Sequence, residues 1–240
     1  MPNWCYTSFS ITGPKSDLDS FVEAITLREN GEIQKDKYGA VVYDLTQLYP
    51  TPEELKITAT FFSSDETSPE AVEMKQKYEA NIAKYGYPHW YEWCWAKWGT
   101  KWPPNFTDFH NLSHEARPEV LGHYETAWSP CDALWVKVSE QYPNLTILTS
   151  YTEESDAFIG ASVFRAGVLY EVGTDFSGES LAELDGELLA DWLVNEAKMA
   201  EIDYDYNHPS YDELEESRHD LKERIRDYCG AQALALATAG

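Results

Sequence analysis

The amino-acid sequence predicts an α+β fold, in which an antiparallel sheet carries a helical insertion and is followed by an acidic C-terminal helical appendage. Three observations lead to this prediction. Segments such as 3–12 and 145–151 alternate between apolar and polar residues, as half-buried strands do. Other segments repeat apolar residues at intervals of three and four, the period of an amphipathic helix. Beyond about residue 178 the chain becomes strongly acidic and keeps a helical period.

The N-terminal part of the chain predicts a strand, a helix and a second strand. Residues 3–12 alternate and form the first strand. A Gly-Pro pair at 13–14 turns the chain into a helix that we expect to end near residues 30–31, an Asn-Gly pair. Residues 38–45 are mostly strand formers and are predicted as the second strand.

The middle of the chain combines helices with further strands. Helical spacing returns at 69–85 and leads into a tryptophan-rich stretch whose helix should stop at Gly99. Residues 103–118 have no clear period and are predicted to be irregular. The remaining predictions are a strand over 122–128, a helix capped by Ser129 with Pro130 in its first turn, a strand over 145–151, and a hairpin of 157–164 and 168–172.

The last third of the chain predicts two acidic helices joined by an acidic linker. The final residues, 231–240, are expected to fray. We divide the chain into a sheet domain at 1–178, with a helical insertion at about 56–120, and a helical region at 179–240. The expected apolar faces are Leu181, Leu184, Leu188, Trp192 and Leu193 on the first helix, and Leu214, Leu221, Ile225 and Tyr228 on the second.

The predicted order of elements is strand, helix, strand, insertion, strand, helix, strand and hairpin, which is a ferredoxin-like split βαβ arrangement. Local motifs also occur in a definite order: Pro2-Asn3-Trp4-Cys5 with Ile11-Thr12-Gly13-Pro14, Tyr49-Pro50-Thr51-Pro52-Glu53-Glu54-Leu55, Trp98-Gly99-Thr100-Lys101-Trp102 and Thr126-Ala127-Trp128-Ser129-Pro130. With these motifs, roughly residues 1–173 resemble the YubB-type ferredoxin-like domain proteins of bacterial plasmids and phages. The resemblance implies a mobile-element accessory protein and implies no particular biochemical activity.

The formal net charge of −24 is the strongest anomaly of the composition. Residues 150–216 hold 18 carboxylates and two basic residues, so this segment carries a net charge of −16. Such a field opposes nucleic-acid and anionic-membrane binding, and it favours a basic protein surface. A merely solvated, solubilising face is the alternative. The predicted partner-binding residues are Glu183, Asp185, Glu187, Asp191, Glu213 and Glu216.

The stretch 87–102 holds five of the nine tryptophans. Such rings either fill an irregular core or form a platform for a flat ligand, because each ring is large and presents a π face. As a platform, the stretch would bind a small ligand such as a nucleotide, with stacking rings and a lysine at the phosphate. The predicted ligand-binding residues are Trp95, Lys97, Trp98, Lys101 and Trp102, and Trp4, Tyr6 and Trp128 could supply further rings.

Signals of catalysis and of cofactor binding are weak. His110 and His114 lie four residues apart, but spacing supplies no third ligand, so we predict neither a metal site nor a cofactor. The chain has no Gly-rich phosphate loop and no nucleophile motif, and its four cysteines lack metal or redox spacing. No apolar run suits a membrane span or a signal peptide, which predicts a cytoplasmic protein.

These observations predict a non-enzymatic phage or plasmid accessory protein that binds a basic host factor, such as a component of a bacterial defence system, through its acidic surface. One alternative is a binding protein for a nucleotide signal that uses the tryptophan-rich stretch. A second alternative is a hydrolase whose site is assembled only by folding.

Overall fold

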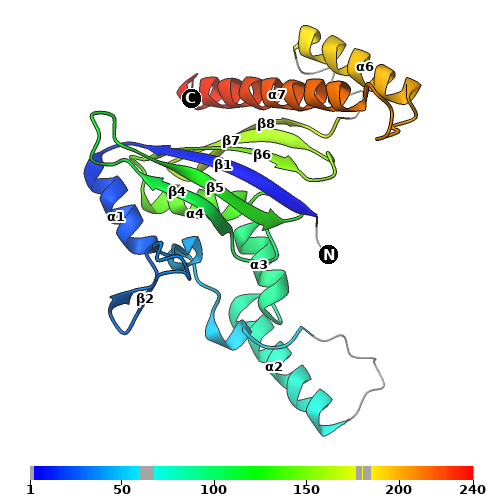
Figure 1. Ribbon diagram of the computed structural model, residues 1–240. Coiled ribbons are helices and arrows are strands. Elements are labelled where there is room, and N and C mark those ends of the chain that lie inside the picture. The colour runs from blue at the N-terminus through cyan, green and yellow to red at the C-terminus, as the bar shows by residue number, and fades with distance from the viewer. Residues whose placement is uncertain (1–2, 60–67, 177–179, 181–184, 240) are drawn as a thin grey trace.

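The computed structural model describes residues 3–59, 68–176, 180 and 185–239 of the chain (Figure 1). A six-stranded antiparallel sheet lies at its centre, with the strand order β4-β5-β1-β6-β7-β8. Helices α1 and α4 lie on one face of the sheet, and α7 crosses the other face (Figure 1). Among the described helices, none combines the length and the apolar character needed to cross a bilayer.

The ferredoxin-like prediction is confirmed by the order of the elements. Strands β4, β5, β1 and β6 stand in the order of a split βαβ doublet, with every neighbouring pair antiparallel. Strands β7 and β8 form the predicted hairpin and extend the sheet beyond β6. The bounds are β1 (Trp4–Thr12), α1 (Lys15–Ile25), β4 (Asn105–Asn111), β5 (Glu119–Ala127), α4 (Asp132–Gln141), β6 (Thr146–Glu153), β7 (Ile159–Arg165) and β8 (Val168–Thr174).

The main core lies between the sheet and helices α1 and α4. Strand β1 alternates as predicted, and its residues Cys5, Phe9 and Ile11 are buried. Trp135 of α4 is fully buried, and its indole Nε1 donates a 2.9 Å hydrogen bond to the hydroxyl of Tyr124 on β5. A buried indole needs such an acceptor, so this bond lets a large ring close the core without an unsatisfied donor.

The first helix ends earlier than predicted, because the Asn-Gly pair belongs to a hairpin and not to a helix end. Helix α1 stops at Ile25, and β2 (Arg28–Glu29) pairs with β3 (Glu32–Ile33). Asn30 and Gly31 join these strands with φ angles of 52° and 84°. Two consecutive residues with positive φ are the signature of the tight hairpin turn that favours Asn-Gly.

The predicted second strand at 38–45 is wrong, and β4 takes its place in the sheet. In the described structure, residues 38–44 form isolated β-bridges, such as the one between Thr26 and Tyr43. A 3₁₀ turn follows at Leu45–Leu48. Strand β4 lies in the segment that we predicted to be irregular. The prediction missed this strand because a bulge between Phe106 and Asp108 shifts its register against β5. With one extra residue, Phe106 and Phe109 both pack against the core, which hides the two-residue period.

The insertion contributes α2 (Pro69–Tyr85) and α3 (Trp90–Trp98), and its second half also supplies β4. Both helices end at glycines in the left-handed region, Gly86 and Gly99, as predicted for Gly99. Helix α2 projects away from the sheet (Figure 1), whereas α3 packs against α4. Helix α4 begins at Asp132, so Ser129 does not cap it; its hydroxyl donates instead to the carbonyl of Gly99 at 2.6 Å.

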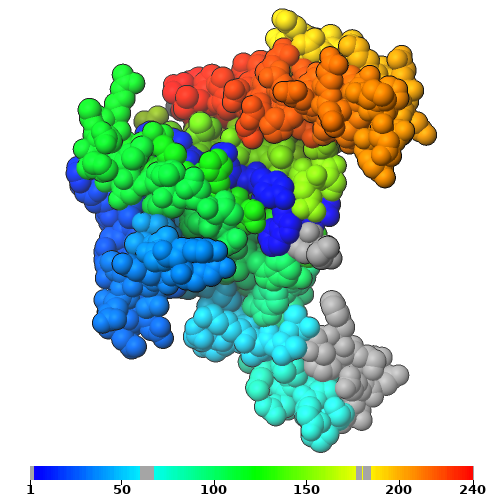
Figure 2. Space-filling model, in the orientation of Figure 1, coloured from blue at the N-terminus to red at the C-terminus, as the bar shows by residue number. Residues whose placement is uncertain are grey.

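The acidic C-terminal region forms α6 (Gly186–Glu201) and α7 (Tyr211–Ala239). The predicted fraying at 231–239 is wrong, since α7 continues to Ala239 and buries Ala233 and Ala237 beside Val163 of β7. Leu193 is 55% exposed and lies off the apolar face, and Leu181 and Leu184 lie outside the described residues. Figure 2 shows α6 and α7, coloured yellow to red, as one ridge along a side of the molecule.

Candidate functional site

The tryptophan-rich stretch is divided between the core and the surface. Trp93 and Trp98 are each 4% exposed and belong to the main core. The indole Nε1 of Trp98 donates a 2.8 Å hydrogen bond to the Tyr49 carbonyl. Trp95 and Trp102 are partly exposed and face other rings. The stretch therefore supplies two rings to the core and two rings to the surface, and the ligand-binding role of the surface rings stays a prediction.

Rings that are partly or fully exposed form a continuous row at one end of the sheet, which we name the aromatic ladder (Trp4, Tyr91, Trp95, Trp102 and Trp128). The Trp95 and Trp128 rings stack with centroids 6.0 Å apart and an interplanar angle of 11°. Trp128 stacks in turn on Trp102 at 6.1 Å, and Trp102 lies 6.2 Å from Trp4. Tyr91 meets the edge of Trp95 at 6.5 Å. Residues from β1, α3 and the end of β5 thus meet in one row.

Lys101 lies over the ladder. Its Nζ is 4.6 Å from the ring centroid of Trp102, 5.0 Å from that of Trp128 and 5.4 Å from that of Tyr91. A cation over an aromatic face gains about 0.5–1 kcal/mol at an exposed site. Lys97 lies apart, with its Nζ 5.7 Å from the Tyr87 ring. The structure therefore brings together Trp95, Lys101 and Trp102 of the predicted ligand-binding set, and it places Lys97 and Trp98 elsewhere.

Trp128 is the strained member of the ladder. Its φ is +68°, a left-handed conformation that is rare for bulky residues, and its side chain is 36% exposed. Hydrogen bonds impose this geometry: the Trp128 amide donates to the Asn3 carbonyl at 2.9 Å, and the Thr100 hydroxyl donates to the Ala127 carbonyl at 3.1 Å. Strain retained beside exposed rings is typical of sites of recognition.

The predicted acidic residues have different roles in the structure. Asp185 caps α6 by accepting from the backbone amide of Glu187 at 2.9 Å, and Asp191 lies 3.0 Å from Arg224 of α7. Glu187, Glu213 and Glu216 are exposed and form no ion pair within the described part of the chain. Glu183 lies outside the described residues. Two carboxylates therefore stabilise the helices, and three face solvent.

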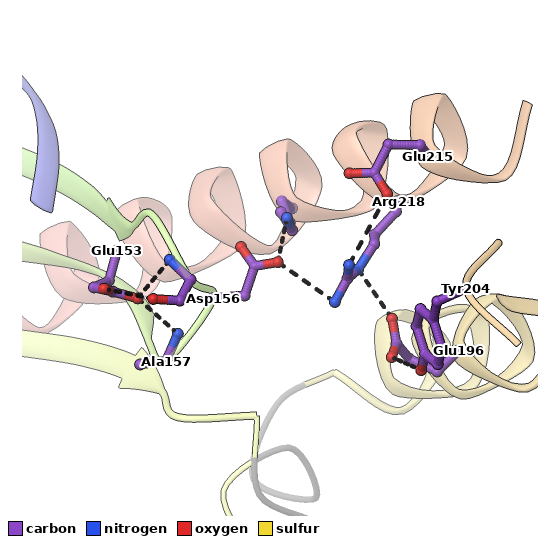
Figure 3. A network of polar contacts seen from close by, with 9 residues as sticks. Glu153, Asp156, Ala157, Glu196, Tyr204, Glu215 and Arg218 are labelled. Atoms are coloured by element: carbon purple, nitrogen blue, oxygen red, sulfur yellow. Dashed lines mark hydrogen bonds and ion pairs between the residues drawn. The ribbon is translucent and has the colours of Figure 1, made fainter. Parts of the chain in front are cut away.

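A network of polar contacts fixes the two C-terminal helices to the sheet domain (Figure 3). Arg218 of α7 forms ion pairs with Asp156 at 3.4 Å and Glu196 at 3.0 Å, and Lys222 reaches the same Asp156 oxygen at 2.7 Å. Tyr204 donates to the other oxygen of Glu196 at 3.2 Å. The network joins the β6–β7 loop, α6 and α7, so the acidic helices are held in a defined position.

A shallow cavity of about 540 Å³, widely open to solvent, lies beside Ser129 and Pro130, the residues that follow Trp128, between the start of α4 and the ends of β6 and β8. Its wall includes Tyr151, whose hydroxyl donates a 2.5 Å hydrogen bond to Glu171 Oε1. Behind them, the Ser162 hydroxyl donates to Asp132 Oδ2 at 3.1 Å. Burial, with a smaller contribution from the charge of Glu171, raises the pKa of Asp132 to about 7.

Sequence reasoning missed this group of residues, since its members come from α4, β6, β7 and β8 and share no spacing. The histidine pair is also separated: His110 on β4 lies 3.0 Å from Asp108, and His114 lies in the following turn. In the described ranges, no three His, Cys, Asp or Glu side chains converge as a metal site would require. The four cysteines are free and buried.

Comparison with known proteins finds a similar family model for the central part of the chain. Residues 97–188 match the family model described as "Ferredoxin-like domain in Api92-like protein". Residues 97–188 are thus similar to a ferredoxin-like domain, in agreement with the fold described above. A crystal structure of the protein api92 from Yersinia pseudotuberculosis is similar over 74% of this chain and 99% of that chain, with 9% identity and a TM-score of 0.37. No curated protein matches. The narrower YubB-type assignment stays a prediction.

The matched range covers part of the aromatic ladder and the lining residues of the cavity. It includes Lys101, Trp102 and Trp128 of the ladder region, and it includes the cavity with Tyr151 and Glu171. The other ladder rings, from β1 and α3, lie before the matched range in the chain. The ladder therefore joins the matched range to the segments that precede it.

Proposed function

We propose that this protein is a non-enzymatic accessory protein of a phage or plasmid that binds a basic host protein in the bacterial cytoplasm. The contact is made by an acidic surface, which we define as Glu187, Glu213 and Glu216 on α6 and α7. A component of a host defence system is the class of partner that we favour. The observation that carries the proposal is that Glu187, Glu213 and Glu216 are exposed and unneutralised on helices that are themselves firmly held.

Charge and rigidity together support this surface. Residues 185–239 hold 14 carboxylates and five Lys or Arg residues. Arg218, Lys222 and Arg224 are used within the fold, since they pair with Asp156 or with carboxylates of α6. Exposed charges of one sign steer a partner of opposite charge and raise its association rate. A surface that is already ordered loses little entropy on binding.

Co-purification from bacterial cells tests the proposal with variants of equal charge. The triple variant Glu187→Gln, Glu213→Gln, Glu216→Gln neutralises the acidic surface. The matched control changes three exposed carboxylates elsewhere, Glu29→Gln, Glu32→Gln, Glu79→Gln. We expect the first variant to lose a host protein that the wild type and the control retain. Equal recovery by both variants would contradict the proposal.

Deletion of the helices is not a suitable test. Helix α7 covers Ile159, Ala161 and Val163 of β7, which are buried in the complete chain. Removing residues 180–240 would expose this apolar strand and promote aggregation. Point substitutions at exposed carboxylates leave the covered sheet face unchanged.

The aromatic ladder favours a second candidate function, the binding of a small nucleotide. The supporting observation is the position of Lys101 among half-exposed rings, where a base could stack on Trp128 and a phosphate could meet the ammonium group. Thermal melting with a panel of nucleotides tests it. Under this proposal a nucleotide raises the melting temperature of the wild type. It does not change the melting temperatures of the Trp128→Ala and Lys101→Gln variants. Melting curves that no nucleotide shifts would exclude this candidate.

A further inference from the structure

The cavity beside Ser129 and Pro130 differs from the ladder in its charge. Its wall contains the carboxylates of Glu171 and Asp175, and among the described lining residues there is no lysine, arginine or histidine. Its volume of about 540 Å³ lies within the range of small-ligand pockets. Negative groups in a concave, partly apolar surface concentrate the field and attract cations.

A hydrogen bond from Tyr151 holds the carboxylate of Glu171 in position. Tyr151 is 4% exposed, and its hydroxyl fixes Glu171 Oε1 at 2.5 Å. Gly160 makes room for this hydroxyl, because a Cβ at that position would lie 2.7 Å from the Tyr151 oxygen and 2.9 Å from the Val172 carbonyl. A carboxylate oriented before binding loses little entropy when it pairs with a cation.

The aromatic part of the wall fits an organic cation better than a hydrated metal ion. Phe158 lines the cavity and meets the Tyr151 ring at 5.9 Å, so a flat cation would find an aromatic wall. Planar guanidinium groups combine stacking with several directed N–H donors, which suits such a site.

We propose that this cavity binds a guanidinium or primary ammonium group carried on a short alkyl stem, with Glu171 as its counter-ion and Phe158 as its aromatic wall. The site is separate from the acidic surface of α6 and α7 and does not depend on the proposed function. The cation can come from a free small molecule or from an arginine or lysine side chain, and both sources present the same chemistry.

Calorimetric titration of the complete chain at low ionic strength tests the proposal with n-butylguanidinium and n-butylammonium. The neutral isostere n-butylurea has nearly the same shape and serves as the probe control. We expect a cationic probe to bind at least tenfold more tightly than the urea. Equal affinities for all three probes, or no binding at millimolar concentrations, would overturn the proposal.

Two variants of equal charge locate the site. Glu171→Gln removes the counter-ion and should weaken binding of the cationic probe at least tenfold. Glu154→Gln removes an exposed carboxylate from the same end of the sheet, outside the cavity, and should change affinity less than twofold. Phe158→Leu, which keeps the charge, provides a second variant in case Glu171→Gln does not fold, and it should bind butylguanidinium more weakly. Unchanged affinity in the folded cavity variants would overturn the assignment.

A short arginine peptide and its citrulline counterpart distinguish the two sources of the cation. If the arginine peptide binds at least tenfold more tightly than butylguanidinium, and the citrulline peptide does not, the natural ligand is a protein side chain. If the peptide binds no better than the small probe, the natural ligand is a free organic cation. A citrulline peptide that binds as tightly as the arginine peptide would contradict recognition of charge.

Discussion

Arg218 of α7 forms an ion pair with Glu196 of α6, with the guanidinium Nε 3.0 Å from the carboxylate Oε1 (Figure 3). The same guanidinium reaches Asp156 in the β6–β7 loop and lies 5.5 Å from the Trp192 ring centroid. Its side chain is 19% exposed, so water screens these pairs less than it screens surface pairs. One cation therefore links both acidic helices to the sheet domain.

Replacement of this cation should loosen the helical pair. We expect Arg218→Met to lower the free energy of unfolding by about 1–3 kcal/mol, since it leaves Glu196 partly buried without its partner while Lys222 still neutralises Asp156. Urea unfolding measures the loss. Arg226→Met is the control, because among the described residues Arg226 pairs with Glu223 on its own helix alone, and it should cost less than about 0.5 kcal/mol. Equal losses in the two variants would contradict this account of the network.

The division of the tryptophans predicts unequal effects on stability. Trp98→Ala should lower the free energy of unfolding by about 3–5 kcal/mol, because it empties a buried position and removes the bond to the Tyr49 carbonyl. Trp95→Ala should cost about 1 kcal/mol, since it removes one exposed stacking contact. Denaturant titration of both variants gives the comparison. Similar losses would show that the ladder and the core are one packing unit.

Asp132 should make the protein less stable as pH rises, whereas a salt-bridged carboxyl makes a protein more stable as pH rises. Its pKa is raised from 3.8 to about 7, so the folded chain keeps a proton that the unfolded chain releases. The free energy of unfolding therefore falls as pH rises from about 4 to about 7, and each unit of pKa difference corresponds to about 1.4 kcal/mol.

Asp132→Asn removes this dependence and tests it. We expect the wild type to lose about 1–3 kcal/mol more stability than the variant between pH 5 and pH 8. Asp220→Asn, at an exposed position on α7, is the control and should follow the wild type. Urea unfolding at the two pH values gives the result. Parallel losses in the wild type and Asp132→Asn would mean that Asp132 ionises in the folded protein as it does in water.

The local sequence pattern was sufficient to predict an element when the residues of that element carried the signal themselves. The alternation in β1, the left-handed Gly99 and the hairpin of β7 and β8 were all predicted from short stretches. Strand β4 was hidden because its bulge places Phe106 and Phe109 three residues apart on one face, which breaks the two-residue period of a strand. The Asn-Gly hairpin at residue 30 was a readable signal that we took for a helix end.

The candidate sites depend on contacts that no short stretch contains. Trp128 joins Trp95 and Trp102 because hydrogen bonds tie the end of β5 to the segment after α3. The sequence shows that these rings are present, but it does not show which of them stack on one another. The group around Tyr151 and Glu171 comes from four elements and becomes visible only in the folded chain. Both sites are therefore determined by which distant segments of the chain lie together in the fold, and not by residue type.

The central claim, binding through the acidic surface, is tested most directly by the association rate of the co-purified host protein at increasing salt concentration. The account predicts a steep fall in rate for the wild type and a much shallower fall for the triple variant at Glu187, Glu213 and Glu216, because screening removes long-range attraction. Dissociation should change little in the wild type over the same range. A rate that is insensitive to salt, or equal slopes in the wild type and the triple variant, would contradict the claim.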